Sequence, residues 1–133
     1  MVRSSAPDPL QSQSRQATAE RQNRYRRGYW AEYIAAAYLI AKGYRILARR
    51  FKTPAGEIDV IAIRGGRVAF IEVKHRATRG DCEAAVTPRL RQRVRRAADL
   101  WLAKRPRYQG LDLGFDLVFI IPRSWPIHLR DAL

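Results

Sequence analysis

The sequence predicts a single α/β domain in which helix, three strands, helix and a fourth strand form a mixed sheet covered on both faces. The prediction rests on two helical apolar stripes, on short β-branched runs between and after them, and on a length of 133 residues, which suits one core. Residues 1–24 are poor in large apolar side chains and rich in Ser, Gln, Arg and Pro. We therefore expect a disordered basic tail before a domain that spans residues 25–133.

The first helix is expected over residues 28–42, and Gly43 follows it as a C-terminal cap. The predicted apolar stripe contains Trp30, Tyr33, Ile34, Ala37, Tyr38 and Ala41. Glu32 falls roughly opposite this stripe. Because the helix dipole favours acids in the first turns, the residues alone favour that role for Glu32 slightly over catalysis.

The next three strands form a meander whose second turn is well defined. A first strand is expected over residues 44–51, and Gly65-Gly66 then makes a two-residue hairpin turn between the second and third strands. A symmetric turn there pairs Arg64 with Arg67, which places Asp59 directly opposite Glu72.

This hairpin gathers ionisable groups at one end. Side chains alternate along a strand, so Glu57, Asp59, Glu72 and Lys74 are expected on one face. Opposed carboxylates, roughly 4.5–5.5 Å apart at Cβ, repel each other unless a cation lies between them. Hard oxygen ligands with open positions suit Mg²⁺, or Mn²⁺, bound to a phosphate. Lys74 could activate water or neutralise phosphate charge.

The alternative is that these acids are exposed strand ends balanced by Lys74 and nearby arginines. The apolar residues on both faces of the hairpin argue against it, because they indicate that both faces are covered and that the acids are partly buried. We favour the metal site, on the condition that no bulge shifts the strand register.

Several segments carry a resemblance to a known family: Gly28-x-x-x-Glu32, Ala36-x-Tyr38-Leu39-x-x-x-Gly43-Tyr44, Gly56-Glu57-Ile58-Asp59, Phe70-Ile71-Glu72-Val73-Lys74-x-Arg76, Phe115-Asp116-Leu117-Val118 and Ile127-His128-Leu129-x-x-Ala132. From about residue 24 to the C-terminus, the chain resembles the YraN-like family of small bacterial proteins, which are classed as predicted endonucleases. That family is similar to the PD-(D/E)XK nucleases and, among them, to archaeal-type Holliday junction resolvases.

The resemblance implies a restriction-endonuclease-like core with named site residues. Asp59 would be the acid of the second strand, Glu72 and Lys74 the E-x-K pair of the third, and Glu32 an acid of the first helix. It also implies that Asp59 and Glu72 hold a divalent metal together with the carbonyl of Val73. A further catalytic residue on the second helix is left unassigned.

The second helix is the expected nucleic-acid surface. Thr87 is its N-cap, Pro88 follows, and the expected apolar stripe contains Leu90, Val94, Ala97, Ala98, Trp101 and Leu102. Between the stripe positions lie Arg89, Arg91, Arg93, Arg95 and Arg96, which we interpret as a DNA-backbone contact surface. Residues 114–121 form the fourth strand, parallel to the third.

The net charge of +14, from 26 basic and 12 acidic residues, predicts a polyanionic partner. The leading hypothesis is a metal-dependent endonuclease that acts on DNA, with branched DNA as a candidate substrate. The alternatives are a non-catalytic nucleic-acid-binding protein with the same fold and an RNA-associated factor, because charge does not distinguish RNA from DNA. Self-association into a homodimer is left open.

The single cysteine, Cys82, predicts neither a disulfide nor a zinc site. The longest apolar run is far too short to cross a bilayer, and no signal-peptide pattern opens the chain. A cytoplasmic protein is expected.

Overall fold

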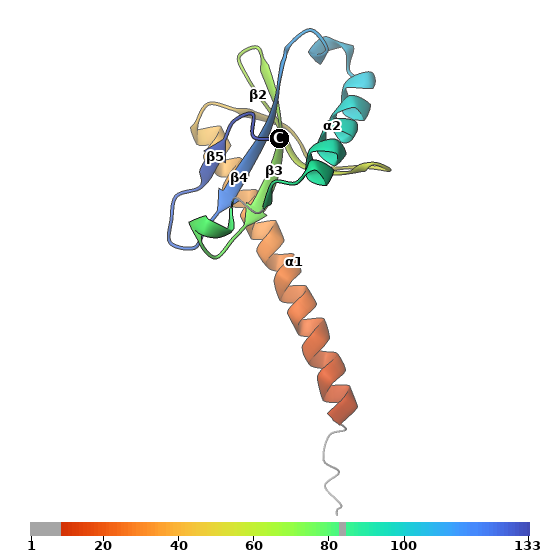
Figure 1. Ribbon diagram of the computed structural model, residues 1–133, viewed down its shortest axis with the longest axis vertical. Helices are drawn as coiled ribbons and strands as arrows, with labels where there is room; N and C mark the ends of the chain where they lie inside the picture. The colour runs from red at the N-terminus through yellow and green to blue at the C-terminus, as the bar shows by residue number, and fades with distance from the viewer. Residues whose placement is uncertain (1–8, 83–84) are drawn as a thin grey trace, which may run out of the picture.

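Five strands form one mixed sheet that separates two helices. The computed structural model describes residues 9–82 and 85–133. Its elements are α1 (Pro9–Ala41), β1 (Arg45–Thr53), β2 (Gly56–Arg64), β3 (Arg67–His75), η1 (Arg79–Asp81), α2 (Pro88–Ala103), η3 (Pro106–Tyr108), β4 (Asp112–Ile120) and β5 (Ile127–Leu129). The sheet order is β1-β2-β3-β4-β5, and only β3 and β4 run parallel. The expected α/β class and element order are confirmed, with β5 added at the edge (Figure 1).

The sheet has a hydrophobic core on each face. The α1-side core contains Ala31, Ala35, Leu39, Tyr44, Val60, Ala62, Ala69, Ile71, Val118 and Ile120. The α2-side core includes Ile58, Ile61, Val68, Phe70, Leu117 and Phe119 together with the six residues of the predicted α2 stripe, all of which are buried. Thr87 caps α2, since its side chain accepts a hydrogen bond from the N–H of Leu90. Burial of both faces fits a sheet with a parallel crossover.

Helix α1 differs from its prediction in two ways. It begins at Pro9, so from that residue the expected disordered tail is helical, while residues 1–8 lie outside the described residues. No Gly or Pro interrupts residues 10–27, and Gln, Arg, Ala and Glu, which favour helices, are frequent there. Figure 1 shows this part of α1 extending away from the sheet. None of the helices in the described part of the chain is long and apolar enough to cross a membrane.

The second difference in α1 is which face it buries. The predicted stripe was wrong: Trp30, Tyr33 and Ile34 are exposed, and Ala31, Ala35 and Leu39 pack on the sheet instead. Small side chains allow α1 to lie close to the strands. Glu32 consequently lies on the buried side of α1 and is only 8% exposed.

The register of the β2–β3 hairpin is confirmed from Arg64–Arg67 to Val60–Ile71. The side-chain alternation, however, shifts by one residue at Asp59. Ile58 was expected on the face of Val60, but it packs in the α2-side core with Ile61.

The irregularity has a counterpart on β1. Arg50 lies between the pairs Arg49–Val60 and Phe51–Ile58 and has a φ of 52°. A bulky residue in this left-handed region is a local strain of a kind found at functional sites.

The C-terminal segment is held to β4 by buried charges. Asp116 receives two hydrogen bonds from the Arg67 guanidinium, at 2.6 and 2.9 Å. His128 Nε2 lies 2.8 Å from Asp116 Oδ2, and Lys42 Nζ lies 2.8 Å from His128 Nδ1. Because an ammonium only donates, Nδ1 accepts and Nε2–H donates to Asp116. This network positions β5 beside β4.

Candidate metal centre

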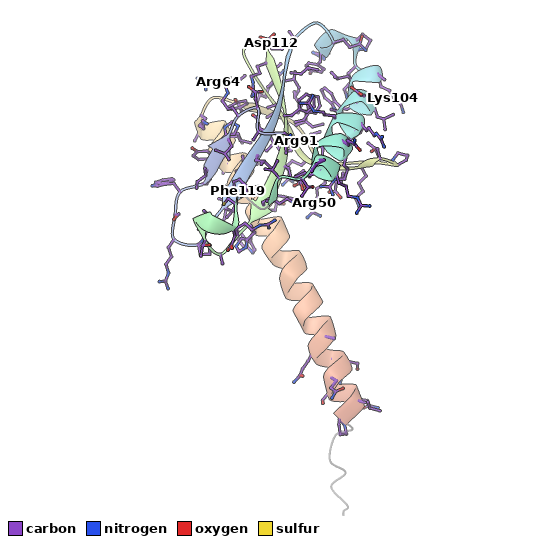
Figure 2. The ribbon with its side chains drawn as sticks, in the orientation of Figure 1. Arg50, Arg64, Arg91, Lys104, Asp112 and Phe119 are labelled. Atoms are coloured by element: carbon purple, nitrogen blue, oxygen red, sulfur yellow. The ribbon has the colours of Figure 1, made fainter. Side chains whose placement is uncertain are left out.

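One cavity of about 340 Å³ collects the acidic residues at the end of the sheet. It draws its lining from α1, β1, β2, β3 and α2: Glu32, Arg50, Lys52, Gly56, Glu57, Asp59, Glu72 and Arg93. Figure 2 places Arg50 at the end of the sheet nearest to the point where α1 leaves it. Both helices and the first three strands therefore meet at one polar cavity.

Asp59 is held by the backbone of β3. Its Oδ2 accepts a hydrogen bond of 2.8 Å from the N–H of Val73, just beyond the last hairpin pair. Burial, followed by the neighbouring charge of Glu72, raises the pKa of Asp59 to about 7, although the Val73 N–H opposes the shift. The charged form of Asp59 is therefore short of a compensating positive charge.

Asp59 belongs to a cluster of three carboxylates. One ligand oxygen from each of Glu32, Glu57 and Asp59 lies within 4.8 Å of the others. Arg50 Nε donates to Glu32 Oε2 at 2.6 Å, so the strained residue on β1 orients the acid of α1. Because the alternation shifts at Asp59, Glu57 lies on the α1 side of the sheet, near Glu32. Without the shift, Glu57 would lie on the face that carries Glu72.

Glu72 lines the same cavity but has its own cationic partners. Its Oε1 lies 3.2 Å from Lys74 Nζ and 3.0 Å from Arg93 Nη2. Its Oε2 is buried without a hydrogen-bond partner among the residues that the structure describes, and so is Arg93 Nε. A buried carboxylate oxygen left in this state costs free energy unless a ligand satisfies it.

Gly56 makes room for Arg93. A Cβ added to Gly56 would lie 2.4 Å from Arg93 Cγ and 2.6 Å from its Cδ, and Gly56 has a φ of 139°. The cavity wall is thus built so that the stem of an α2 arginine crosses the start of β2 and reaches Glu72.

The donor set fits a hard divalent cation. Carboxylate oxygens are the ligands that Mg²⁺ and Mn²⁺ prefer. The cluster of Glu32, Glu57 and Asp59 offers three such groups, and the unpartnered Glu72 Oε2 offers a fourth in the same cavity. A bound cation would also supply the positive charge that Asp59 lacks.

The predicted site residues are only partly brought together. Asp59, Glu72 and Glu32 line one cavity, and Lys74 joins through Glu72. The predicted metal ligands were Asp59, Glu72 and the Val73 carbonyl. The carboxylates whose oxygens lie within 4.8 Å of one another are instead those of Glu32, Glu57 and Asp59. In a strand, the N–H and C=O of one residue point to the same side, so the carbonyl of Val73 is directed toward Asp59 as its N–H is.

The five α2 arginines do not form one surface. At 3.6 residues per turn, Arg89, Arg93 and Arg96 share the flank beside the acidic cavity. Arg91 and Arg95 lie on the other flank. There Arg95 donates to the C-terminal carbonyl of Leu133 at 2.8 Å and covers the Phe115 ring at 4.3 Å. The expected single surface is therefore corrected to two flanks, of which one adjoins the acids.

A second cavity lies next to the first along α2, and we call the two together the groove along α2. It has a volume of about 300 Å³ and lies between the β1–β2 turn and α2, where Phe51, Lys52, Thr53 and Pro54 face Leu100, Lys104 and Arg105. Lys52 lines both cavities. The flank of α2 that adjoins the acids thus leads past Lys52 to Lys104.

Sequence reasoning missed Arg50 and gave Arg93 a surface role. The position of Arg93 on the helix could have been predicted. The apolar stripe fixes which way α2 faces, and at 3.6 residues per turn Arg93 then lies on the opposite flank from Arg91 and Arg95. No sequence pattern indicates the position of Arg50, because it lies at an irregular point of the β1–β2 ladder, between the pairs Arg49–Val60 and Phe51–Ile58.

Comparisons with known proteins identify relatives of the chain. The family model described as "Uncharacterised protein family UPF0102" matches residues 31–120. A UPF0102 protein of Chelativorans sp. (strain BNC1) is 51% identical over 116 residues, which cover 87% of this chain and 94% of that relative. A UPF0102 protein of Rhodopseudomonas palustris (strain BisA53) is 57% identical over 113 residues, which cover 85% and 87%. These matches confirm the resemblance to YraN-like proteins, and the chain belongs to the protein family UPF0102.

Proposed function

We propose that the protein is a metal-dependent endonuclease that hydrolyses phosphodiester bonds in DNA. The observation that carries the proposal is the state of Asp59, a half-buried carboxylate that is fixed by the N–H of Val73 beside Glu72 and whose pKa is raised to about 7. An acid that is costly to ionise in a polar cavity is a functional-site signature. Two carboxylates that face a phosphate repel it, so a protein that only binds nucleic acid gains nothing from them.

The roles within the cavity follow from its contacts. Glu32, Glu57 and Asp59, with Glu72, would hold Mg²⁺ or Mn²⁺. When bound, such a cation lowers the pKa of water and stabilises charge on a phosphoryl oxygen. Lys74, 3.2 Å from Glu72, is placed to orient the attacking water or to neutralise charge on the phosphate. Arg93 supplies a planar fork of donors for phosphate oxygens.

The groove beside α2 supports DNA as the partner. Arg89, Arg93, Arg96 and Lys104 lie along one flank of the helix, and Lys52 faces them from the β1–β2 turn. From residue 89 to residue 104 this flank is about 22 Å long at 1.5 Å per residue. At 3.4 Å per base pair, it matches roughly six steps of duplex. One strand of a duplex lying there would reach the acidic cavity at the N-terminal end of α2.

The test is cleavage of a panel of duplex, flap, junction and single-stranded DNA with Mg²⁺ or Mn²⁺. Asp59→Asn and Glu72→Gln should abolish cleavage while leaving DNA binding intact, because an amide is a poor ligand for a hard cation. Lys74→Ala should abolish cleavage without abolishing metal binding, since an ammonium is no ligand and its loss removes a competitor for Glu72 Oε1. Cleavage that persists in Asp59→Asn would point to a contaminant or to another site.

One observation favours a non-catalytic nucleic-acid-binding protein as the second candidate. Lys74 and Arg93 already neutralise Glu72 Oε1 without a metal. If wild-type protein binds DNA but cleaves no member of the panel with either metal, even in large excess over substrate, the binding function replaces the nuclease.

A further inference from the structure

A third cavity lies on the α1 side of the same end of the sheet. It has a volume of about 310 Å³, and its lining includes Trp30 and Ile34 of α1, His75 of β3, and Pro122, Arg123 and Pro126 of the loop after β4. Trp30 on its rim is 68% exposed, and Trp125, in the loop that forms its opposite wall, is 84% exposed. Two exposed indoles beside one apolar cavity indicate a binding surface. We call Trp30, Ile34 and residues 121–126 the indole face.

The loop that carries Trp125 is constrained. Ile121 O accepts a hydrogen bond from the N–H of Ser124, which closes a turn with Pro122 and Arg123 at its centre. Arg123 has a φ of 62°, a left-handed conformation that this turn requires and that is unfavourable for arginine. Pro122 and Pro126 fix φ on both sides of Trp125. Trp125 is therefore presented by a loop with little conformational freedom to lose on binding.

The charge around the indole face selects an anionic partner. Its only ionisable lining residues are His75 and Arg123, so the described lining contains no carboxylate. Residues 9–29 of α1, which precede Trp30, contain five arginines and one glutamate. In Figure 1 this part of α1 leaves the sheet at the end that holds the acidic cavity. A ligand that combines flat apolar rings with negative charge matches both properties.

The volume of the cavity limits the size of the ligand. At about 310 Å³, it is at the lower end of sites for small organic ligands, so it admits a nucleotide but no base-paired duplex. Aromatic side chains bind single-stranded nucleic acid by stacking on its unpaired bases, whatever their sequence.

The indole face and the acidic cavity adjoin each other across the sheet. His75 follows Lys74 on β3, and Trp30 lies within one turn of Glu32 on α1. The groove along α2 approaches the same acids from the other face. A DNA in which paired and unpaired segments meet would place its duplex in that groove and its unpaired bases on the indole face.

We propose that the indole face binds unpaired nucleotides by stacking on Trp30 and Trp125, so that the substrate class is DNA with a junction between duplex and single strand. The proposal rests on the proposed nuclease function for its biological meaning. The binding it describes does not depend on cleavage and is measured without metal.

The experiment uses fluorescence anisotropy of the full chain in EDTA with three labelled DNAs: a single strand, a blunt duplex, and the same duplex with a single-stranded flap. Trp30→Ala combined with Trp125→Ala should weaken binding to the single strand and the flap by roughly 10-fold or more. Binding to the blunt duplex should change by less than about twofold, since its phosphates are held electrostatically. Because both indoles are exposed, thermal unfolding should match that of the wild type.

The matched control replaces both tryptophans by phenylalanine, which retains a stacking surface and should restore most of the affinity for the single strand. An equal loss on all three DNAs, or no loss on any, would overturn the proposal. So would a wild-type dimer in sedimentation that the double Ala variant dissociates, because the face would then serve self-association. If wild-type protein binds flap DNA through the tryptophans but never cleaves it, the nuclease proposal fails and this one stands.

Discussion

The N–H of Val73 donates a hydrogen bond of 2.8 Å to Asp59 Oδ2, which ties the acid of β2 to the strand that carries Glu72 and Lys74. The β2–β3 ladder ends one pair earlier, at Val60–Ile71. The carboxylate thus replaces a backbone acceptor at the point where the hairpin opens. This contact fixes the position of Asp59 without neutralising it, and the consequences can be measured.

The first prediction concerns pH. Because the pKa of Asp59 is raised to about 7 in the folded protein, the folded state binds more protons than the unfolded state between about pH 4 and pH 7. The contribution of Asp59 to the free energy of unfolding therefore falls as pH rises through this window. Asp59→Asn should raise the Tm of metal-free protein by several degrees at about pH 8 and by little at about pH 4. Thermal unfolding in EDTA across this range measures it.

The control is Asp99→Asn on the exposed side of α2, which removes one carboxylate outside the cavity. It should leave the pH dependence of Tm unchanged. Mg²⁺ should raise the Tm of the wild type and of Asp99→Asn, but not that of Asp59→Asn. A Tm for Asp59→Asn that follows the wild type at every pH would contradict the raised pKa.

The second prediction separates Arg93 from the other α2 arginines. Arg93 contacts Glu72 Oε1, where it would compete with a metal ion, and in the proposed complex it would also face the phosphates of the DNA. Arg93→Ala should therefore strengthen Mg²⁺ or Mn²⁺ binding in calorimetry by severalfold while weakening DNA binding. Arg91→Ala, an exposed change on the opposite flank, should leave metal affinity unaltered. Weaker metal binding in Arg93→Ala would show that the guanidinium organises the acids instead of competing with a cation.

Much of this arrangement was predictable from sequence, for identifiable reasons. The α2 stripe and the Gly65–Gly66 register came out as expected, because strong periodicity and a defined turn type each specify one geometry. Asp59 and Glu72 line one cavity, but their expected direct pairing is not part of the ladder, which ends at Val60–Ile71.

The errors came from contacts that periodicity does not encode. In α1, the large side chains of Trp30, Tyr33 and Ile34 suggested the buried face, but close packing on the sheet selected alanines and Leu39. That rotation also brought Glu32 into the cavity. The shift at Asp59 lies opposite the strained Arg50 of the neighbouring strand, and alternation read along β2 alone therefore misplaced Ile58.

The third prediction tests the close approach at Gly56. Gly56→Ala adds a Cβ where Arg93 Cγ lies and forces a side chain into a φ of 139°. It should destabilise the fold by about 1–3 kcal/mol and weaken DNA binding by displacing Arg93. Gly66→Ala is the control, since its added Cβ meets no described atom within 4 Å and should cost much less. Urea unfolding of both variants decides between them.

The fourth prediction concerns the charges buried at β4. Burial alone would raise the pKa of the fully buried Asp116, but hydrogen bonds from His128, from Arg67 and from the N–H of Asp131 together hold it well below the usual value. Its stabilising contribution is complete above about pH 4 and is lost progressively below that. Asp116→Asn should cost about 3–5 kcal/mol at neutral pH, because the Arg67 charge stays buried with a weaker partner.

Asp116→Asn should also show a smaller loss of stability on acidification than the wild type. Asp112→Asn, an exposed change on the same strand, serves as the control and should behave like the wild type. Urea unfolding at neutral and at acid pH measures both effects. A cost for Asp116→Asn no larger than that of Asp112→Asn would mean that the network contributes little to the fold.

The last prediction tests the groove beside α2. Arg96 and Arg91 are both exposed on one helix, so their Ala variants remove the same charge, but only Arg96 lies on the flank next to the acids. If duplex DNA lies along that flank, Arg96→Ala should weaken binding to all sequences alike. It should also reduce the slope of log K against log salt by about 0.9, the value for one phosphate contact. Arg91→Ala should change neither quantity beyond the small effect of net charge. Equal effects of the two variants would show that DNA is attracted by the overall charge of +14 and follows no defined path across the protein.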